Sequence, residues 1–186
     1  MEPKPIVTIT LDRDEKFLRQ KAVLFEIRNG KFAHGEKTFT RTEINQLLME
    51  MKKSMRAAHG VGLSANQIGL TYKLFVAEVP DNQGENKFYA IFNPELETIG
   101  SNKDKSEEGC LSVPALWGEV SRHDRVVLRG YDKNARPVKI KAWALLARVF
   151  QHEVDHLNGI LFIDKAKSLH QAPESERLRA REKDLK

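Results

Sequence analysis

The stretch QHEVDHLNG, residues 151–159, contains two histidines four positions apart. On an α-helix, side chains at this spacing lie one turn apart on the same face, so His152 and His156 can both contact a single metal ion. Glu153 follows the first histidine directly and lies within reach of a water molecule on such an ion. This HExxH pattern therefore predicts a helix that carries a metal site.

The predicted helix runs from about residue 144 to 157 and ends at Asn158 and Gly159, because asparagine and glycine commonly terminate helices. Leu145 and Val149 continue the histidine face towards the start of the helix. The helix thus offers an apolar wall next to its metal ligands. That pattern is expected of an enzyme with an apolar substrate pocket.

A third ligand is required, and two protease patterns do not supply it well. In metzincin-type proteases it is a histidine six residues after the second one, where this chain has Phe162. A gluzincin-type protease needs a glutamate from a further helix. The nearest candidates, Glu174 and Glu176, lie in a charged segment after Pro173. These departures weaken the alternative of an HExxH-type metallopeptidase.

The other candidate ligand is Cys110, the only cysteine of the chain, in SEEGCLSVP at residues 106–114. A single cysteine excludes an internal disulfide and is often just a small buried apolar residue. One thiolate with two imidazoles, however, makes a three-ligand set that leaves a fourth tetrahedral position for water. That is the arrangement of a catalytic metal site.

A further stretch, HGVGLSANQIG at residues 59–69, formally matches the dinucleotide fingerprint GxGxxG/A through Gly60, Gly62 and Ala65. That fingerprint must follow a strand, whereas this one follows a predicted helix, so a Rossmann fold is excluded. A simple glycine turn does not explain why the amide side chain of Gln67 closes the segment.

The helix that precedes this stretch is predicted from about residue 40 to Gly60. Thr40 and Glu43 have capping-box spacing. Apolar residues then recur at helical intervals at Ile44, Leu47, Leu48, Met51 and Met55.

Strands are expected at residues 6–9, 73–79, 88–92, 125–131 and 136–142. Asn93 and Pro94 are expected to stop the third of these strands, and the last two should form a hairpin in which Pro137 places the second strand near an edge. Strands and helices are segregated rather than alternating. The predicted fold is therefore α+β, with antiparallel sheets packed around the HExxH helix.

Composition limits the number of domains and the broad class of protein to which this chain can belong. The chain has 186 residues, 40% hydrophobic and 31% charged, which is enough for one compact domain over residues 1–186. The start MEPKPIVTIT lacks the pattern of a signal peptide, and no apolar run approaches the roughly 20 residues of a membrane span. We expect a soluble, cytoplasmic protein with no membrane or DNA partner.

The net charge of +5 and pI near 9.3 would suit an RNA-rich partner. The segment from about residue 165 to 186 is somewhat basic, but acids are interleaved with its lysines and arginines. This pattern favours a solvated, charged C-terminal helix.

Together, GVGLSANQ, EGCLS and QHEVDHL resemble, in this order, the three signature motifs of the peptide deformylases. The resemblance covers roughly residues 43–164. It implies an enzyme that removes the formyl group from the N-terminal formylmethionine of newly made proteins. It also implies site residues: Cys110, His152 and His156 as metal ligands, Glu153 as general acid/base, and Gln67 with the backbone N–H of Leu111 as oxyanion donors.

The chain departs from the family pattern in three places. Ser64 and Asn66 stand where the first motif usually has alanine and proline, which alters the polarity and stiffness of that loop. Residues 26–40 form a longer and more polar segment than is usual, and the first 25 residues match only loosely. These departures bear on the mouth of the pocket and leave the chemistry unchanged.

A peptide substrate is an extended strand, and Gly62 and Gly109 lack side chains that would block its backbone from pairing with the enzyme. We therefore expect the substrate to add as a strand between these two segments. Val61, Leu145 and Val149 would line a slot for a methionine-like side chain, because a thioether suits an apolar pocket.

The sequence alone does not decide which metal ion is bound, and it leaves two further rival functions open. A Cys-His-His set accepts Fe(II), Co(II), Ni(II) or Zn(II), and zinc binds more tightly than iron in the usual order. Iron is therefore inferred from the resemblance alone. Besides the metallopeptidase, the rivals are a hydrolase with Cys110 as nucleophile and a binding module that kept the fold and lost the reaction. The charged C-terminal helix is a candidate for docking on ribosomal RNA, as in some bacterial relatives.

Overall fold

The computed structural model describes residues 2–81 and 83–171. Its helices are α1 (Asp12–Leu18), α2 (Arg41–Ala57) and α3 (Ala144–Leu157), with short 3-10 helices η1 (Ala65–Ile68) and η2 (Phe162–Asp164). Its strands are β1 (Glu26–Arg28), β2 (Lys31–His34), β3 (Lys37–Thr38), β4 (Gly62–Ser64), β5 (Leu74–Pro80), β6 (Asn86–Thr98), β7 (Lys103–Cys110), β8 (Val113–His123), β9 (Arg125–Tyr131), β10 (Pro137–Trp143) and β11 (Leu169–Gln171).

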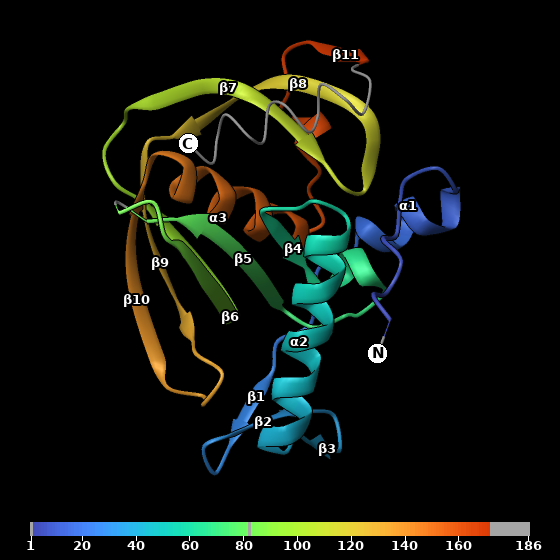
Figure 1. Cartoon of the computed structure of the whole chain (residues 1–186), viewed down its shortest axis with the longest axis vertical. Coiled ribbons are helices and arrows are strands. Elements are labelled where there is room, and N and C mark those ends of the chain that lie inside the picture. Colours follow the sequence, from blue (N-terminus) through green and yellow to red (C-terminus); the bar gives the residue numbers. More distant parts are fainter. Residues whose placement is uncertain (1, 82, 172–186) are drawn as a thin grey trace.

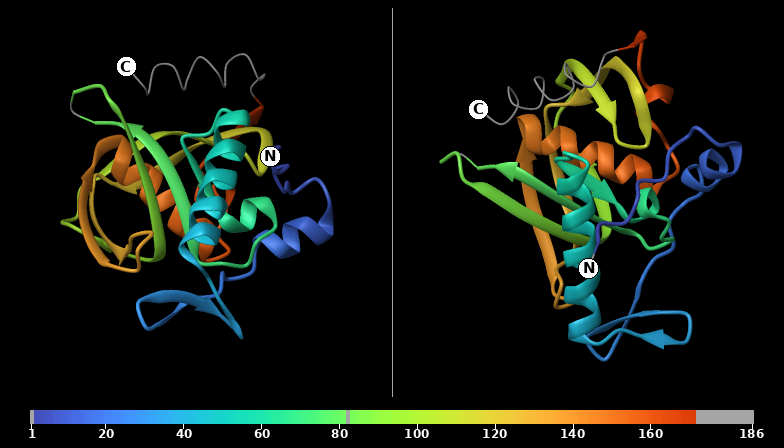
Figure 2. Two further views of the ribbon diagram at one scale, coloured as in Figure 1. Left: turned by 60° about the horizontal axis from the view of Figure 1, so that its bottom comes forward. Right: turned by 45° about the vertical axis from the view of Figure 1, so that its right-hand side comes forward.

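These strands form three antiparallel sheets, two of which pack against α3, and this confirms the predicted α+β fold. The largest sheet has the order β10-β9-β6-β5-β4, and two three-stranded sheets have the orders β11-β8-β7 and β1-β2-β3. Helix α3 lies between the five-stranded sheet and the β7–β8 hairpin, while α2 crosses the molecule beside β4 (Figures 1 and 2). The helix with the HExxH pattern is therefore enclosed by strands on two sides.

Helix α2 matches its prediction closely. Thr40 Oγ1 accepts a hydrogen bond from the backbone N–H of Glu43, and the Glu43 carboxylate accepts one from the backbone N–H of Thr40. The apolar residues predicted for its inner face are all buried, and they pack in one cluster with Leu63 and Phe92. The reciprocal cap sets the start of the helix, and burial of its apolar face holds it against the sheet.

The cap of α2 should make stability depend on pH. Hydrogen bonds from Thr40, together with Lys37, lower the pKa of Glu43 from 4.5 to about 2. Because the folded-state pKa is depressed, the stabilisation is complete above pH 4.5 and is lost as pH falls towards 2. We expect Glu43→Gln to be less stable than the parent protein at neutral pH, with a difference that shrinks over this interval. Urea unfolding of both proteins across the interval tests this, and a pH-independent difference would contradict it.

The prediction that Asn93 and Pro94 end a strand is wrong. Strand β6 continues to Thr98, and its pairing with β9 shifts register between Phe92 and Glu95. Such an irregularity accommodates a proline because no ladder hydrogen bond is required there. The Asn93 side chain also pairs with both backbone groups of Phe25, which ties the N-terminal segment to the sheet.

The other strand predictions differ in outcome. The β9–β10 hairpin is confirmed, and β10 with Pro137 is an edge strand. Residues 6–9 belong to no sheet, but the N–H groups of Val7 and Ile9 donate to the backbone oxygens of Gln67 and Ser112. This segment therefore braces two loops that lie next to the predicted site.

The segment at residues 26–40, longer than expected for the family, folds as the small sheet β1-β2-β3. Phe32 on β2 is buried and stacks on Phe92, with ring centroids 4.1 Å apart. Phe25 and Phe39 complete the aromatic cluster. The insertion is thus a hairpin fastened to the main core by aromatic packing.

The C-terminal helix predicted from about residue 165 is not present at its start. Leu169–Gln171 form strand β11, which pairs with β8. The rest of the predicted helix, residues 172–186, lies outside the described residues. Among the described residues, none of the helices combines the length and apolarity that crossing a bilayer requires.

Candidate metal centre and catalytic pocket

Helix α3 places the two histidines of the HExxH pattern opposite the end of β7. The helix begins after Trp143 and ends at Asn158, and Gly159 follows with a left-handed φ of 76°. Phe150 and Leu157 are fully buried on the sheet side. Its predicted bounds are therefore confirmed, and the turns that carry His152 and His156 sit in the interior.

The structure brings Cys110, His152 and His156 together. One ligand atom from each residue lies within 4.8 Å of the other two, and Cys110 Sγ is 3.0 Å from His156 Nε2. Metal bonds to thiolate and imidazole are about 2.0 to 2.3 Å long. A single ion can therefore bridge the three atoms after small side-chain shifts.

Electrostatics in the cluster also suit a cation. Burial raises the pKa of the Cys110 thiol, but the imidazoles of His156 and His152 outweigh burial and hold that pKa well below its usual value. Burial lowers the pKa of His152, but Cys110 and Glu108 outweigh it and raise that pKa. A cluster that stabilises a thiolate beside positive charge is one that a metal cation fits.

Glu108 orients the first histidine and was missed by the sequence analysis. Its Oε2 lies 3.0 Å from His152 Nδ1, which leaves Nε2 of that ring facing Cys110. Arg122 binds the same carboxylate through two hydrogen bonds of 2.9 and 2.8 Å, and Arg148 adds a third of 2.7 Å. Glu108 and Arg122 are 6% and 3% exposed, so this is a buried ionic network. Arg122 also pairs with Asp155.

The network keeps Glu108 ionised. Burial raises its pKa, but the hydrogen bonds from Arg122 and His152 outweigh burial and hold the pKa well below the usual value. The only sequence signal for this role is the glutamate of EGCLS, which precedes the cysteine by two residues. Its partners lie 14 to 44 positions away, so spacing alone does not identify them.

Glu153 is buried beside the metal-ligand cluster, with 3% of its surface exposed. Ser64 Oγ lies 2.7 Å from its Oε2 and 2.9 Å from its backbone oxygen. Burial raises the pKa of Glu153, and the opposing effects of the two imidazoles and Ser64 do not cancel that rise. A carboxyl group with a raised pKa is suited both to accept and to return a proton.

Gly62 is required by Glu153. A Cβ added at Gly62 would lie 2.3 Å from Glu153 Oε1. This glycine therefore makes room for the carboxylate, a role that the sequence analysis did not identify. The expectation that it also admits substrate backbone stays a prediction.

We expect Gly62→Ala to lower strongly the deformylating activity that the family resemblance implies, since Glu153 must leave its position or the β4 backbone must move. Gly69→Ala is not a suitable control, because Gly69 has a left-handed φ of 79°. The control is Ala65→Gly on the adjoining η1, because this substitution changes a neighbouring residue without adding atoms. Formate release from formyl-Met-Ala measures both variants, and parental activity in Gly62→Ala would contradict this account.

Gln67 lies on η1 with its amide orientation set by its neighbours. The backbone N–H of Ser64 donates to Oε1 at 2.9 Å, so Nε2 points the other way, towards Ser112 Oγ at 3.1 Å and Cys110 Sγ at 3.6 Å. The amide nitrogen therefore points towards Ser112 and Cys110, and Gln67 lines the pocket beside them. Leu111 lies in the turn directly after Cys110 and lines the same pocket.

The two departures in the first motif both form hydrogen bonds to α3. Ser64 contacts Glu153 as described, and Asn66 Nδ2 donates to the backbone oxygen of His156 at 2.8 Å. Asn66 is 2% exposed. Polar side chains at these two positions thus tie the loop that carries Gln67 to the helix that carries the candidate metal ligands.

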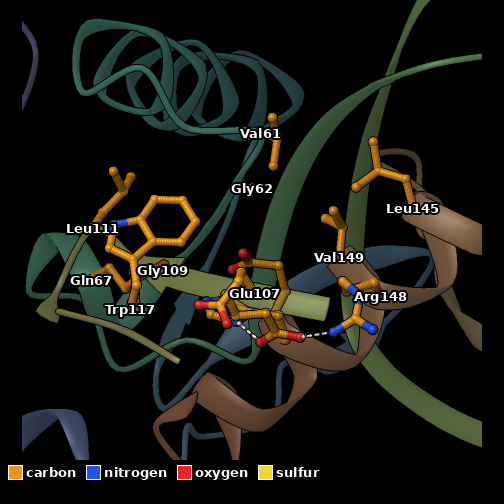
Figure 3. Close-up of a pocket in the computed structure, with 14 residues that line it drawn as sticks. Val61, Gly62, Gln67, Glu107, Gly109, Leu111, Trp117, Leu145, Arg148 and Val149 are labelled. Atoms are coloured by element: carbon orange, nitrogen blue, oxygen red, sulfur yellow. Dashed lines mark hydrogen bonds and ion pairs between the residues drawn. The ribbon is translucent and has the colours of Figure 1, made fainter. Parts of the chain in front are cut away.

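A pocket of about 100 Å³ opens above these residues. In Figure 3, Leu145 and Val149 lie on one side, Leu111, Gln67 and Trp117 on the other, with Val61 and Gly62 between them. The structure therefore brings together every residue predicted for the site. It adds Trp117, Arg148 and Glu107, which the sequence analysis did not select.

Gly109 has a structural role in addition to the expected access for substrate backbone, which stays a prediction. It pairs with Trp117 across the β7–β8 hairpin, and a Cβ at Gly109 would lie 2.9 Å from the indole ring. The glycine therefore lets the indole lie flat against β7 and form a pocket wall. No local sequence pattern indicates this contact, because it depends on the register of two strands.

Comparison with known proteins identifies the family. The model of the polypeptide deformylase family matches residues 15–172. The chain belongs to the polypeptide deformylase family. A peptide deformylase of Halothermothrix orenii is 47% identical over 120 residues, which are 64% of this chain and 75% of that protein. One from Prochlorococcus marinus (strain AS9601) is 39% identical over 147 residues, 78% of this chain and 73% of that protein.

Solved deformylase structures share the fold. The peptide deformylase of Synechococcus elongatus in complex with actinonin has a TM-score of 0.73 and 31% identity, covering 90% of this chain and 83% of that one. A probable peptide deformylase from Synechococcus phage S-SSM7 has a TM-score of 0.73 and 33% identity, covering 87% and 99%. The protein is thus a hydrolase that removes the formyl group from formylmethionyl peptides, and the alternative of an HExxH-type metallopeptidase is not favoured.

Proposed function

We propose that Cys110, His152 and His156 hold one divalent metal ion and that Glu153 is the general acid/base of the deformylation reaction. The observation that carries this proposal is the convergence of the three ligand atoms within 4.8 Å, with Glu153 buried at their side. An ion held there would lower the pKa of a water molecule and polarise the formyl carbonyl.

In the proposed reaction, Glu153 carries both proton transfers. Glu153 accepts a proton from the water that attacks the formyl carbon. The carbon–nitrogen bond breaks next, and Glu153 returns the proton to the departing amine, which leaves formate and a methionyl peptide. Gln67 Nε2 and the Leu111 N–H stabilise the negative charge on the formyl oxygen, and each well-placed donor is worth on the order of 3 kcal/mol.

The peptide is proposed to bind as an added strand between β4 and β7. Both strands stand at the end of their sheets, so each can accept a partner along its free side. The side chain of the first residue would enter the apolar slot formed by Val61, Leu145 and Val149. A methionine side chain matches that slot in polarity and flexibility.

Iron(II) is the proposed native metal, with zinc, nickel or cobalt able to replace it in purified protein. This choice rests on the family resemblance, because a Cys-His-His set binds all four ions. Metal analysis after anaerobic purification, followed by activity assays of each reconstituted form, tests it. A zinc form as active as the iron form would remove the reason to prefer iron.

The proposed setting is the cytoplasm, at formylmethionyl N-termini of nascent peptides, with no DNA or membrane partner. Docking on the ribosome through the basic C-terminal segment is part of this proposal. The test deletes residues after Gln171, because Leu169–Gln171 belong to a sheet and must stay. Unchanged, salt-insensitive ribosome association of the truncated protein would end the idea.

The decisive assay is formate release from formyl-Met-Ala with and without a metal chelator. We expect activity that the chelator abolishes and that added Fe(II) restores. A hydrolase that used Cys110 as nucleophile would keep its activity in chelator, and a binding module would release no formate. Either result would overturn the proposed chemistry.

A further inference from the structure

A pocket of about 350 Å³, at the end of the molecule away from α3, has four positively charged residues in its lining. Its cations are Lys31, Arg41, Lys133 and Arg136. They come from the inserted hairpin, the first turn of α2 and the β9–β10 turn, which lie together at the bottom of Figure 1. We name these four residues the cationic cleft.

Carboxylates do not line this cleft. Its other residues are the apolar or neutral Gly30, Phe32, Phe39, Ile44, Asn134 and Ala135. The catalytic pocket, by contrast, is lined by Glu107, Glu108 and Glu153. The cleft is therefore a concave surface of one charge sign within a chain of mixed charges.

Nearby acids are already engaged. Glu43 caps α2 and pairs with Lys37, and Asp132 accepts hydrogen bonds from the backbone of Asn134 and Arg136. Within the described part of the chain, the side chains of the four cleft cations form no ion pair. Four exposed cations held around one concavity repel each other, and an anionic partner would relieve that repulsion.

We propose that the cationic cleft docks the phosphate backbone of RNA. The cations are exposed on an open rim rather than buried, which suits several weak contacts to an extended polyanion. It suits a single enclosed phosphate less well. The choice of RNA among polyanions rests on the proposed function, because new peptides emerge from an RNA-rich particle. Docking at this end leaves the catalytic pocket beside α3 free to face the peptide.

The test measures binding of a fluorescein-labelled single-stranded uridine 20-mer by anisotropy, using the full chain. The cleft variant is Arg41→Glu with Lys133→Glu. Glutamate in the first turn of a helix is favourable, so the Arg41 change should not weaken α2. The control is Lys21→Glu with Lys103→Glu, which changes the net charge equally at exposed lysines outside the cleft.

We expect the cleft variant to bind RNA about tenfold or more weakly and to lower the slope of log K against log salt by about 1.4, as for two lost phosphate contacts. The control should retain most binding, and formyl-Met-Ala deformylation should be unchanged in both. Because RNA binding is measured apart from catalysis, failure of this proposal is distinct from failure of the proposed reaction.

Three results would overturn the proposal. One is equal weakening of the cleft and control variants, which would indicate an effect of net charge only. Another is loss of all RNA binding on truncation after Gln171, which would place the contact in the tail. The third is stronger binding of inorganic phosphate, ATP or anionic lipid vesicles than of RNA.

Discussion

Replacing Glu153 with glutamine is expected to lower kcat for formyl-Met-Ala by about 10²- to 10⁴-fold, the usual contribution of a general acid/base. The amide has the same size and can still accept the Ser64 hydroxyl hydrogen bond. It cannot take up a proton from water or return one to the amine. The metal ligands are untouched, so metal content should stay at the parental level.

The matched control is Glu107→Gln. Glu107 also lines the catalytic pocket, but its ion pair is a 3.8 Å contact to His170 at the surface. The chemical change is identical, and kcat should stay close to the parental value. A Glu153→Gln protein with full metal content and near-parental kcat would show that another group carries the proton.

Replacing Glu108 with glutamine is expected to destabilise the protein by about 3 kcal/mol, at the lower end of the cost of breaking a buried ion pair. The lower end applies because Arg122 keeps Asp155 as a partner. Arg148 loses its 2.7 Å ion pair and keeps only backbone oxygens. Urea unfolding of metal-free protein measures the difference in the free energy of unfolding.

The same substitution should weaken metal binding by about 10- to 100-fold, since the carboxylate that orients His152 is lost. Competition with a chromogenic chelator measures this. Glu107→Gln again serves as the control, with an expected change in stability within about 0.5 kcal/mol. A decrease in the free energy of unfolding below about 1 kcal/mol in Glu108→Gln, the value of an exposed ion pair, would contradict the stabilising role of the buried ionic network.

Much of the site was predictable because its signals are local. The i,i+4 histidines with the intervening glutamate predict one face of a helix, and α3 has the expected bounds. The single cysteine was a candidate because it completes a three-ligand set. Gln67 was selected because its amide had no role in a simple turn.

For other residues, the sequence pattern did not reveal the neighbours that decide the local structure. Gly62 and Gly109 were selected for substrate access, which stays a prediction, and the structure shows that they also make room for Glu153 and Trp117. Asn93 and Pro94 indicated the end of a strand, but β6 bulges past them because β9 pairs with it on both sides of the irregularity. In each case a neighbour distant in sequence decides the outcome.

By itself, the amino-acid sequence determined the capped helix α2, the helix α3 with its two imidazoles, the β9–β10 hairpin and the residue types of the candidate metal centre. These features depend on periodicity and spacing within a few turns of chain. Only the tertiary structure decided that Glu108 meets Arg122, Arg148 and His152, that Ser64 holds Glu153, and that four cations gather in one cleft. Such contacts join residues tens of positions apart, and they arise from how the sheets pack around α3 rather than from any local pattern.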